Sequence, residues 1–313
     1  MKRVMLAAAM LMTALPAWAA DYTIMAPAAP GGGWDQTART MQNLMQQEGI
    51  SGNVQVTNVP GAGGTIGLAQ FVNQASGDPE DLLVGGYVMV GAILTNQSPV
   101  DLSMVTPIAR LTGEQEAIVV PASSDIQTIA DLVAKLKADP GAVSWGGGSA
   151  GGTDHIVAGL VAKAAGVDPT KVNYIAFSGG GEALAAILGN QVTVGVSGLG
   201  EFVSQVEAGS LRLLAVSGDE RIEGLDAPTL KEAGLDVSLE NWRMVAAGPD
   251  LTPEQVAAIS ADIEKLVTSD AWKQELATRG WNDRYLAGAD FQKELASDIE
   301  ATKAILTDIG LVQ

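Results

Sequence analysis

Four short apolar runs in this sequence each lead into a glycine-rich loop, and each loop leads into a stretch with helical character. An apolar run, a turn and a helix in that order form the unit of an α/β layer fold with parallel strands. The unit recurs without any true sequence repeat, so the sequence predicts a repeated architecture only. The four loops are Gly31–Trp34, Gly146–Gly152, Ser178–Gly181 and Ser197–Gly200.

The same alternation predicts individual elements along most of the chain. We expect strands at Tyr22–Ala26, Val54–Val59, Leu82–Gly85, Ala117–Val120, Val143–Trp145, Val172–Phe177, Val192–Val196, Leu211–Val216 and Trp242–Ala247. We expect helices at Asp35–Gln47, Thr65–Asn73, Thr128–Ala138, Asp154–Ala165, Glu182–Leu188 and Asp290–Asp308, with another that begins after Thr252. Thr252 is a suitable N-cap because Pro253 and Gln255 follow at the positions of a capping box.

The length of the chain and two of its strands predict two lobes. About 290 residues exceed the usual size of a single hydrophobic core. The strand that ends at Pro121 and the strand near Trp242–Ala247 can cross between lobes in opposite directions. We therefore expect lobe 1 to contain residues 21–120 and 241–313, and lobe 2, inserted into it, to contain residues 121–240.

The first 20 residues have the pattern of a secretory signal peptide. Lys2 and Arg3 precede an apolar run from Val4 to Leu15, and small residues follow at Ala17 and Ala19. This run is shorter than a membrane span. Cleavage after Ala19 fits the small-residue rule, whereas the alternative, cleavage after Ala20, would put Trp18 at a position that favours a small residue. We expect an exported, periplasmic protein, because no later segment has an uncharged apolar stretch of spanning length.

The charge of the chain excludes several kinds of partner. It has 18 basic and 36 acidic residues, and removal of Lys2 and Arg3 leaves 16 − 36 = −20. Such an acidic protein is a poor partner for nucleic acid or an anionic membrane. The chain has no cysteine and a single histidine, His155, so disulfides and histidine-based metal sites are not expected.

Cofactor motifs are also missing. The loop Gly61–Gly67 resembles a dinucleotide-binding loop, but Ile66 stands where the third glycine of that motif is required. No phosphate-binding loop of the NTPase type is present. We therefore expect neither a cofactor nor a metal.

The glycine loops predict an anion-binding site made of backbone N–H groups. The first amides of a helix lack internal partners, and glycine lets a ligand approach them closely. No Lys or Arg occurs between Met41 and Ala109, so basic side chains there cannot bind an anion. The alternative is that the glycines only permit tight turns. In the first helical turn, Asp35 is expected to cap amides or pair with Arg39 at i+4, and Trp34 either lines a pocket or packs between lobes.

A serine hydrolase is a second alternative. The run Gly147-Gly-Ser149-Ala-Gly151 fits the letters of a nucleophile elbow, and His155 follows it. Six residues along one loop and helix start give poor geometry for a nucleophile and its base. Asp154 and His155 are neighbours on a helix and do not face each other, so a triad is not expected.

The order of several motifs resembles a known family. These motifs are Ala29-Pro-Gly-Gly-Gly-Trp-Asp35, Val59-Pro-Gly-Ala-Gly-Gly-Thr-Ile-Gly67, Tyr174-Ile-Ala-Phe-Ser-Gly-Gly-Gly-Glu182 and Asn241-Trp-Arg243. Along nearly its whole length, the chain resembles the periplasmic substrate-binding proteins of tripartite tricarboxylate transporters, the TctC-like or Bug family. The resemblance implies a two-lobed periplasmic binding protein fold, type II-like, with two crossover strands.

The resemblance also implies a function and a set of site residues. It implies a monomeric receptor, without enzyme activity, that closes over a small carboxylate and docks on a transporter of one large and one small integral membrane subunit. Ligands in the family include citrate-like tricarboxylates, dicarboxylates and aromatic acids; a binding module that reports to a sensor is the alternative. The implied ligand-binding residues are Gly31, Gly32, Gly33, Trp34, Asp35, Gly86, Tyr87, Val88, Ser149, Gly151, Gly152, Thr153, Ser178, Gly179, Gly180, Gly181, Glu182, Ser197, Gly198 and Arg243. For Arg243, contact with a ligand carboxylate and a structural role at the hinge are both open.

Overall fold

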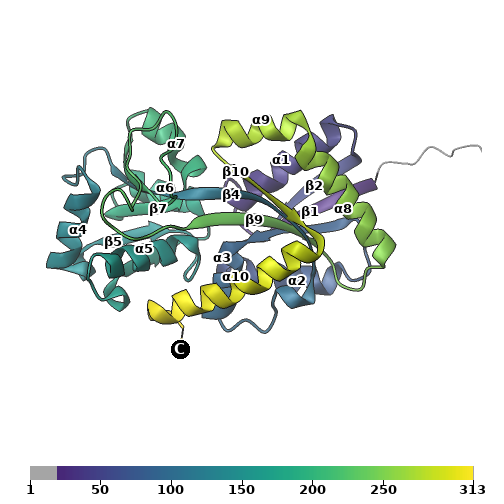
Figure 1. Ribbon diagram of the computed structural model, residues 1–313, viewed down its shortest axis with the longest axis horizontal. Coiled ribbons are helices and arrows are strands. Elements are labelled where there is room, and N and C mark those ends of the chain that lie inside the picture. The colour runs from purple at the N-terminus through teal and green to yellow at the C-terminus, as the bar shows by residue number, and fades with distance from the viewer. Residues whose placement is uncertain (1–19, 313) are drawn as a thin grey trace, which may run out of the picture.

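The computed structural model describes residues 20–312, in which ten strands form one continuous sheet with helices on its faces (Figure 1). The predicted signal peptide therefore lies outside the described residues, apart from Ala20. The strands are β1 (Ala20–Ala26), β2 (Ser51–Asn58), β3 (Asp81–Gly86), β4 (Thr106–Pro121), β5 (Ser144–Gly147), β6 (Asn173–Ala176), β7 (Val194–Gly198), β8 (Leu211–Val216), β9 (Glu240–Ala247) and β10 (Asn282–Ala287).

Most helices follow strands in the order that the sequence predicts. The helices are α1 (Gly33–Gln47), α2 (Thr65–Gln74), α3 (Tyr87–Thr95), α4 (Ile129–Ala138), α5 (Thr153–Ala164), α6 (Gly180–Leu188), α7 (Leu199–Glu207), α8 (Pro253–Thr268), α9 (Asp270–Arg279) and α10 (Gly288–Asp308). The predicted capping box at the start of α8 is confirmed, because Thr252 and Gln255 exchange side chain-to-backbone hydrogen bonds of 3.3 and 2.8 Å.

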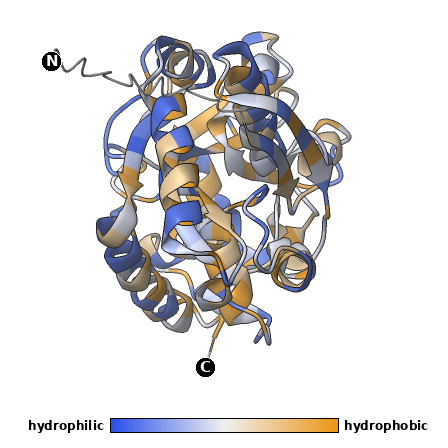
Figure 2. Cartoon of the chain, turned by 90° about the vertical axis from the view of Figure 1, so that its right-hand side faces the viewer, coloured by the Kyte–Doolittle hydropathy of each residue, from blue (hydrophilic) through white to orange (hydrophobic). Residues whose placement is uncertain are grey.

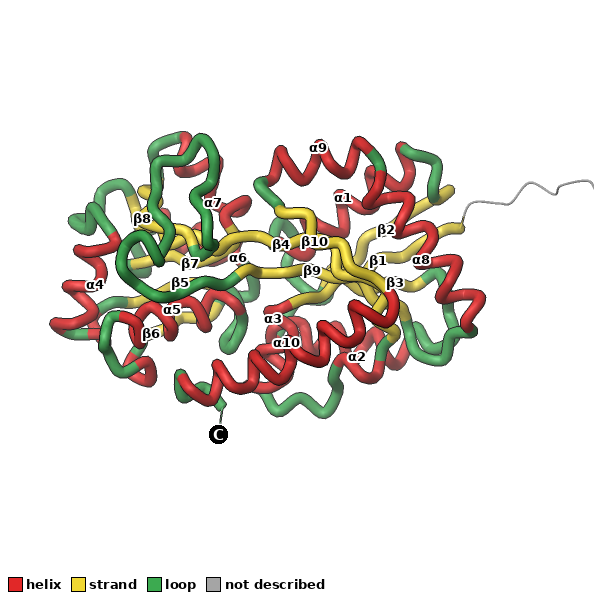
Figure 3. The backbone as a smooth tube through the Cα atoms, viewed as in Figure 1, coloured by secondary structure: helices red, strands yellow, loops and turns green. Residues whose placement is uncertain are grey.

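The sheet is divided into two lobes that one long strand connects (Figure 3). In lobe 1 the strand order is β2-β1-β3-β9-β4, with β1 parallel to both β2 and β3. In lobe 2 the order is β4-β7-β5-β6, with β5 parallel to both β6 and β7. The predicted α/β class with two lobes is confirmed, but the sheet of each lobe is mixed, because β9 pairs antiparallel with β3 and β4, and β4 pairs antiparallel with β7 and β8. The boundaries at residues 120 and 240 remain a prediction.

Strand β4 is much longer than the predicted strand Ala117–Val120. It pairs with β9 from Thr106 to Gln115, and then with β7 and β8 from Glu116 to Pro121. The apolar pattern is interrupted by Thr112, Glu114, Gln115 and Glu116, and this interruption hid the first part of the strand. All four side chains are nevertheless buried, so β4 carries its polar residues into the region between the lobes.

Three elements have no counterpart in the prediction. Helix α3 follows β3 directly and is apolar on almost every side, so its sequence lacks the stripe that identifies a surface helix. Helix α9 and strand β10 lie in the C-terminal part, where the sequence suggests helix alone. Strand β10 pairs antiparallel with β4 after the chain turns at Gly280, whose φ is 66°.

Apolar side chains fill the space between the sheet and the helices. Trp145, Trp272 and Phe291 are completely buried. Figure 2 shows hydrophilic residues on the outer sides of many helices, as expected for amphipathic helices that cover a sheet. Within residues 20–312, no helix is both long enough and apolar enough to cross a bilayer.

Helix α10 begins in lobe 1 and ends against lobe 2. Its residue Asp308 forms an ion pair with Lys163 of α5. The next residue, Ile309, lies so close to Gly159 of α5 that a methyl group there would contact its side chain at 3.0 Å. The end of the chain therefore lies against the lobe that the sequence assigns to residues 121–240.

The hydroxyl of Ser217 joins three segments at the junction of the lobes. It accepts a hydrogen bond from the Glu116 amide at 2.8 Å and donates one to the Leu239 carbonyl at 2.6 Å, and it is fully buried. Replacement by alanine leaves both backbone groups without this partner, at a cost of about 1–3 kcal/mol.

We predict that Ser217→Ala lowers the free energy of unfolding by that amount in urea titrations. The matched control is Ser210→Ala, because Ser210 is exposed, and this variant should unfold like the wild type. Equal stability of the two variants would contradict the structural role of the Ser217 hydroxyl.

Candidate ligand-binding site

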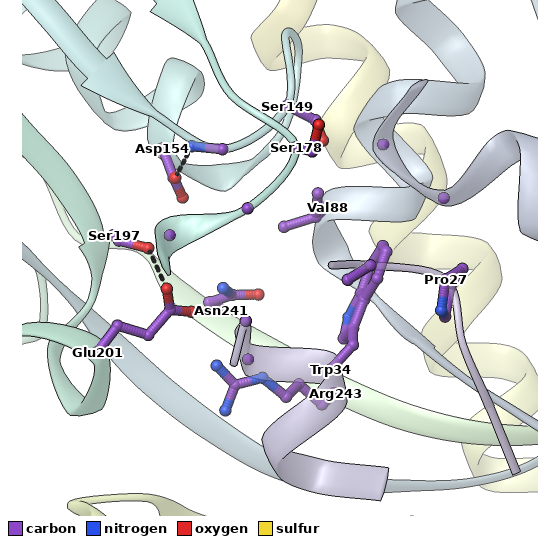
Figure 4. A pocket seen from close by; sticks show the side chains of 18 of the residues that line it. Pro27, Trp34, Val88, Ser149, Asp154, Ser178, Ser197, Glu201, Asn241 and Arg243 are labelled. Atoms are coloured by element: carbon purple, nitrogen blue, oxygen red, sulfur yellow. Dashed lines mark hydrogen bonds between the residues drawn. The ribbon is translucent and has the colours of Figure 1, made fainter. Parts of the chain in front are cut away.

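A cavity with a volume of about 60 Å³ lies between the lobes, at the carboxyl ends of their parallel strands (Figure 4). This is where open α/β sheets usually bind ligands. Its wall includes the starts of α1 and α6 and the loop before α5, all three reached through predicted glycine loops. Ten of the predicted site residues line it: Gly32, Gly33, Trp34, Val88, Ser149, Ser178, Gly179, Gly180, Ser197 and Arg243.

The other ten predicted residues do not line the cavity. These are Gly31, Asp35, Gly86, Tyr87, Gly151, Gly152, Thr153, Gly181, Glu182 and Gly198. The Asp35 carboxylate accepts a 2.8 Å hydrogen bond from the Gly31 amide and pairs with Arg39 at 3.0 Å, as the i+4 spacing predicts. Partial burial disfavours the charge of Asp35, but the hydrogen bonds from Arg39, Gly31 and Asn58 keep its pKa below the ordinary value. Glu182 likewise caps its own loop, accepting from the Ser178 amide at 3.0 Å.

Sequence reasoning missed nine residues of the wall. The missed loop Gly61–Gly64 also follows a strand and precedes a helix, so the argument applied to the other glycine loops would have included it. The buried acid Asp154 and the half-buried acid Glu201 have no local signal, because each occupies an ordinary position in the first turn of a helix. The missed residues are Pro27, Ala28, Gly61, Gly63, Gly64, Gly148, Asp154, Glu201 and Asn241.

The glycine loops make room for charged side chains as well as for a ligand. A Cβ atom on Gly33 would overlap the guanidinium of Arg243, and one on Gly180 would overlap the carboxyl group of Glu201. Two other glycines leave open space instead. A Cβ atom on Gly179 would meet nothing within 4 Å, and one on Gly32 would meet only the Ala29 carbonyl at 3.4 Å and the Ala28 methyl at 3.9 Å.

An ion pair between Arg243 of β9 and Glu114 of β4 forms one end of the cavity. Both side chains are almost completely buried, at 2% and 1% exposure. The Glu114 carboxylate also accepts a 2.6 Å hydrogen bond from the Gly200 amide, and the guanidinium lies 5.1 Å from the centre of the Trp281 ring. Arg243 thus has a structural partner and also faces the cavity.

Three further acids surround this ion pair. Burial, followed by the nearby charge of Glu114, raises the pKa of Glu201 to about 8. Burial also raises the pKa of Asp154 to about 6, although the Gly148 amide donates a hydrogen bond to its carboxylate. The pKa of Glu116 lies well above its usual range, first because it is fully buried and then because Asp154 and Glu114 are close. At neutral pH Glu201 therefore holds a proton, whereas Asp154 is mostly ionised.

Ser149 and His155 are not arranged as a nucleophile and its base. The Nδ1 atom of His155 accepts a 3.2 Å hydrogen bond from the Gly151 amide, and its ring stacks on Tyr174 with centroids 4.1 Å apart. Burial lowers the pKa of His155 to about 4. The histidine supports the loop before α5, and within residues 20–312 no group of three or more acids, histidines or cysteines has the arrangement of a metal site.

The lobes touch across the mouth of the cavity through glycine. A Cβ atom on Gly91 of α3 would overlap the carbonyl of Gly151 in lobe 2, and one on Gly152 would lie 2.9 Å from the side chain of Val88. The structure is therefore a closed form, in which residues of the two lobes are in contact beside the cavity.

The family of the chain follows from a match to the model of the tripartite tricarboxylate transporter family receptor, TctC, over residues 37–311. The chain belongs to this family, whose members are solute-binding proteins and not enzymes. A ligand-free TctC solute-binding protein from Polaromonas is 27% identical with a TM-score of 0.65, and the alignment covers 94% of this chain and 99% of that one.

Two further solved structures share the fold. One is an R. palustris protein with adipate, at 22% identity and a TM-score of 0.83, with 94% of this chain and 98% of that one covered. The other is MatC from Rhodopseudomonas palustris with bound malate, at 22% identity and a TM-score of 0.78, with 93% and 100% covered. The predicted family and two-lobed fold are confirmed.

The first prediction for the site concerns the buried ion pair. Arg243→Ala leaves the Glu114 charge buried without its partner, so the ligand-free protein should lose about 3–5 kcal/mol of unfolding free energy. Chemical denaturation measures this loss. The double variant Arg243→Ala with Glu114→Ala should recover part of it, and simple addition of the two single losses would contradict a coupled pair.

The second prediction concerns closure. Gly91→Ala should stabilise α3 by about 0.5–1 kcal/mol in an open form, while the added methyl group keeps Gly151 from closing on the helix. We expect ligand affinity to fall at least tenfold without loss of thermal stability of the free protein. Gly141→Ala is the control, because Gly141 is exposed and an added Cβ atom there would meet only Asp139 Oδ1 at 3.5 Å; equal affinity of the two variants would contradict the closed contact.

Proposed function

We propose that this chain is a periplasmic receptor that captures a small dicarboxylate or tricarboxylate between its lobes and delivers it to a tripartite tricarboxylate-type membrane transporter. The observation that carries the proposal is the cavity itself, into which helix starts and one buried arginine converge. Delivery to a carrier of one large and one small membrane subunit, by a monomeric receptor, is what membership of the family suggests.

Backbone chemistry supports a carboxylate ligand. Near Gly32 and Gly179 the backbone is open to close approach, at the starts of α1 and α6 respectively. Free N–H groups and the helix dipole favour a negative charge at both places. Two helix starts from opposite lobes suit a ligand with at least two carboxylates, since each lobe then gains an interaction when the cleft closes.

The size of the cavity supports a compact acid. About 60 Å³ is several times the space that one water requires, which suits a small organic acid. Structures with the same fold hold malate and adipate, which are dicarboxylates. We therefore place four- to six-carbon dicarboxylates first and citrate second.

The experiment is a thermal-shift panel on the protein without residues 1–20, with malate, succinate, adipate, citrate, an aromatic acid and a neutral polyol. A ligand at one hundred times its dissociation constant adds about 2.7 kcal/mol of stability. We predict a shift for dicarboxylates and none for the polyol. No shift with any acid, on protein that has been unfolded and refolded to remove copurified ligand, would contradict the proposal.

The variant Gly32→Val ties the shift to the glycine loop. Gly32 has φ of −74°, which any residue can adopt, so the fold should persist while the side chain occupies the place of the carboxylate. We expect the shift to disappear. The matched control is Gly141→Val, because Gly141 is exposed and remote from the cavity.

A further inference from the structure

The end of the cavity that lies against the central strands is made of polar side chains. Asn241 and Arg243 alternate along β9, so both point to the same side of the sheet. Glu201 reaches them from the start of α7 and accepts a 3.3 Å hydrogen bond from the Ser197 hydroxyl. Figure 4 shows Glu201, Asn241 and Arg243 gathered around one space.

Two buried polar atoms at this end have no partner in the part of the chain that the structure describes. The Nη2 atom of Arg243 is held by Glu114, whereas its Nη1 atom receives no acceptor. The Oδ1 atom of Asn241 is likewise without a donor, and the two residues are only 2% and 7% exposed. A buried guanidinium N–H without an acceptor is costly, so this end is built for a ligand oxygen.

The charges around this space are unbalanced. Glu114, Glu116, Asp154 and Glu201 face a single cation, Arg243, which gives 1 − 4 = −3 if every carboxyl group is ionised. Such a net charge cannot be buried without protons. Two of these acids, Asp154 and Glu201, line the cavity. Asp154 accepts a hydrogen bond from the Gly148 amide and interacts with Glu116, whereas Glu201 lies beside Asn241 and Arg243, so Glu201 is the acid that can present a proton at this end of the cavity.

We propose that this end of the cavity is a proton-linked carboxylate subsite, in which Arg243 Nη1 and the protonated carboxyl group of Glu201 each donate a hydrogen bond to one carboxylate of the ligand. The inference rests on the proposed function, because it takes the ligand to be a carboxylic acid. The proton comes from solvent, since Glu201 in an open cleft is exposed to water, where a glutamate has a pKa of about 4.3.

An ammonium group fits the same space poorly. It could donate to Glu201, but it would leave Arg243 Nη1 without an acceptor and place two positive charges side by side. A carboxylate accepts a hydrogen bond from Arg243 Nη1. It can also accept one from Glu201, but only when Glu201 is protonated. The raised pKa of Glu201, about 8 in the closed form, agrees with a proton held there.

The proposal fixes the direction of the pH dependence. Closure over the ligand raises the pKa of Glu201 from about 4.3 to about 8. One proton is therefore taken up on binding at neutral pH, and affinity falls by up to about tenfold for each pH unit between pH 6.5 and 8. The pKa values of Asp154 and Glu116 are raised as well, so a variant is needed to assign the effect to Glu201.

The test is isothermal titration calorimetry of the mature protein with each acid of the panel that binds. Titrations in phosphate and in Tris, whose ionisation enthalpies differ, count the protons taken up. We expect about one proton for the wild type at pH 7. Glu201→Gln keeps a donor in the same place, so it should bind with an affinity that changes less than threefold between pH 6.5 and 8 and take up about one proton fewer. Glu207→Gln, an exposed acid on the same helix, should behave like the wild type.

Each other result has a definite meaning. Binding of an acid without proton uptake, or with uptake that Glu201→Gln leaves unchanged, overturns the proton-linked subsite and leaves the proposed function intact. Loss of binding in Glu201→Gln at every pH also overturns it, because an ionised Glu201 would then be accepting a hydrogen bond from the ligand. If no acid binds at all, both proposals fail.

Discussion

The buried ion pair between Arg243 and Glu114 connects the strands on which the arrangement of the lobes depends. The two residues belong to β9 and β4, which pair antiparallel from Thr106 to Gln115. Both strands carry chain between the lobes, so a rigid connection here fixes where the loops of each lobe meet. Because Arg243 pairs with Glu114 and also lines the cavity, the same position is a structural joint and part of the cavity wall. If the proposed function holds, stability and recognition are coupled at one place in the fold.

Each glycine loop combines two uses that a sequence cannot separate. A larger residue would not fit at Gly33 or Gly180, because Arg243 and Glu201 lie against them. Gly32 and Gly179, in contrast, leave open space at the helix starts. In the sequence these are simply adjacent glycines. Only the fold shows which of them admits a side chain from another strand or helix and which leaves the backbone accessible. This explains why the loops could be recognised as a site while their individual roles could not.

The predictable part of the fold is the part with local signals. Strands that are apolar throughout, glycine stops and the capping box at Thr252 identify most elements of both lobes to within a few residues. The failures occur where a buried position is polar or a buried helix is apolar on all sides, as in the first part of β4 and in α3. The same reason hides Asp154 and Glu201, since a charged residue in a first helical turn normally faces solvent. Whether an acid is buried depends on how the two lobes come together, so it cannot be predicted from the periodicity of the sequence.

The C-terminal helix α10 contacts both lobes. It starts beside β10 in one lobe and reaches α5 in the other, where Asp308 and Ile309 make contact. Any separation of the lobes must either carry the end of this helix along or detach it from α5. The contacts of Asp308 and Ile309 with α5 therefore oppose separation of the two lobes. A label or fusion attached after α10 would therefore lie beside a contact between the lobes that changes when they separate.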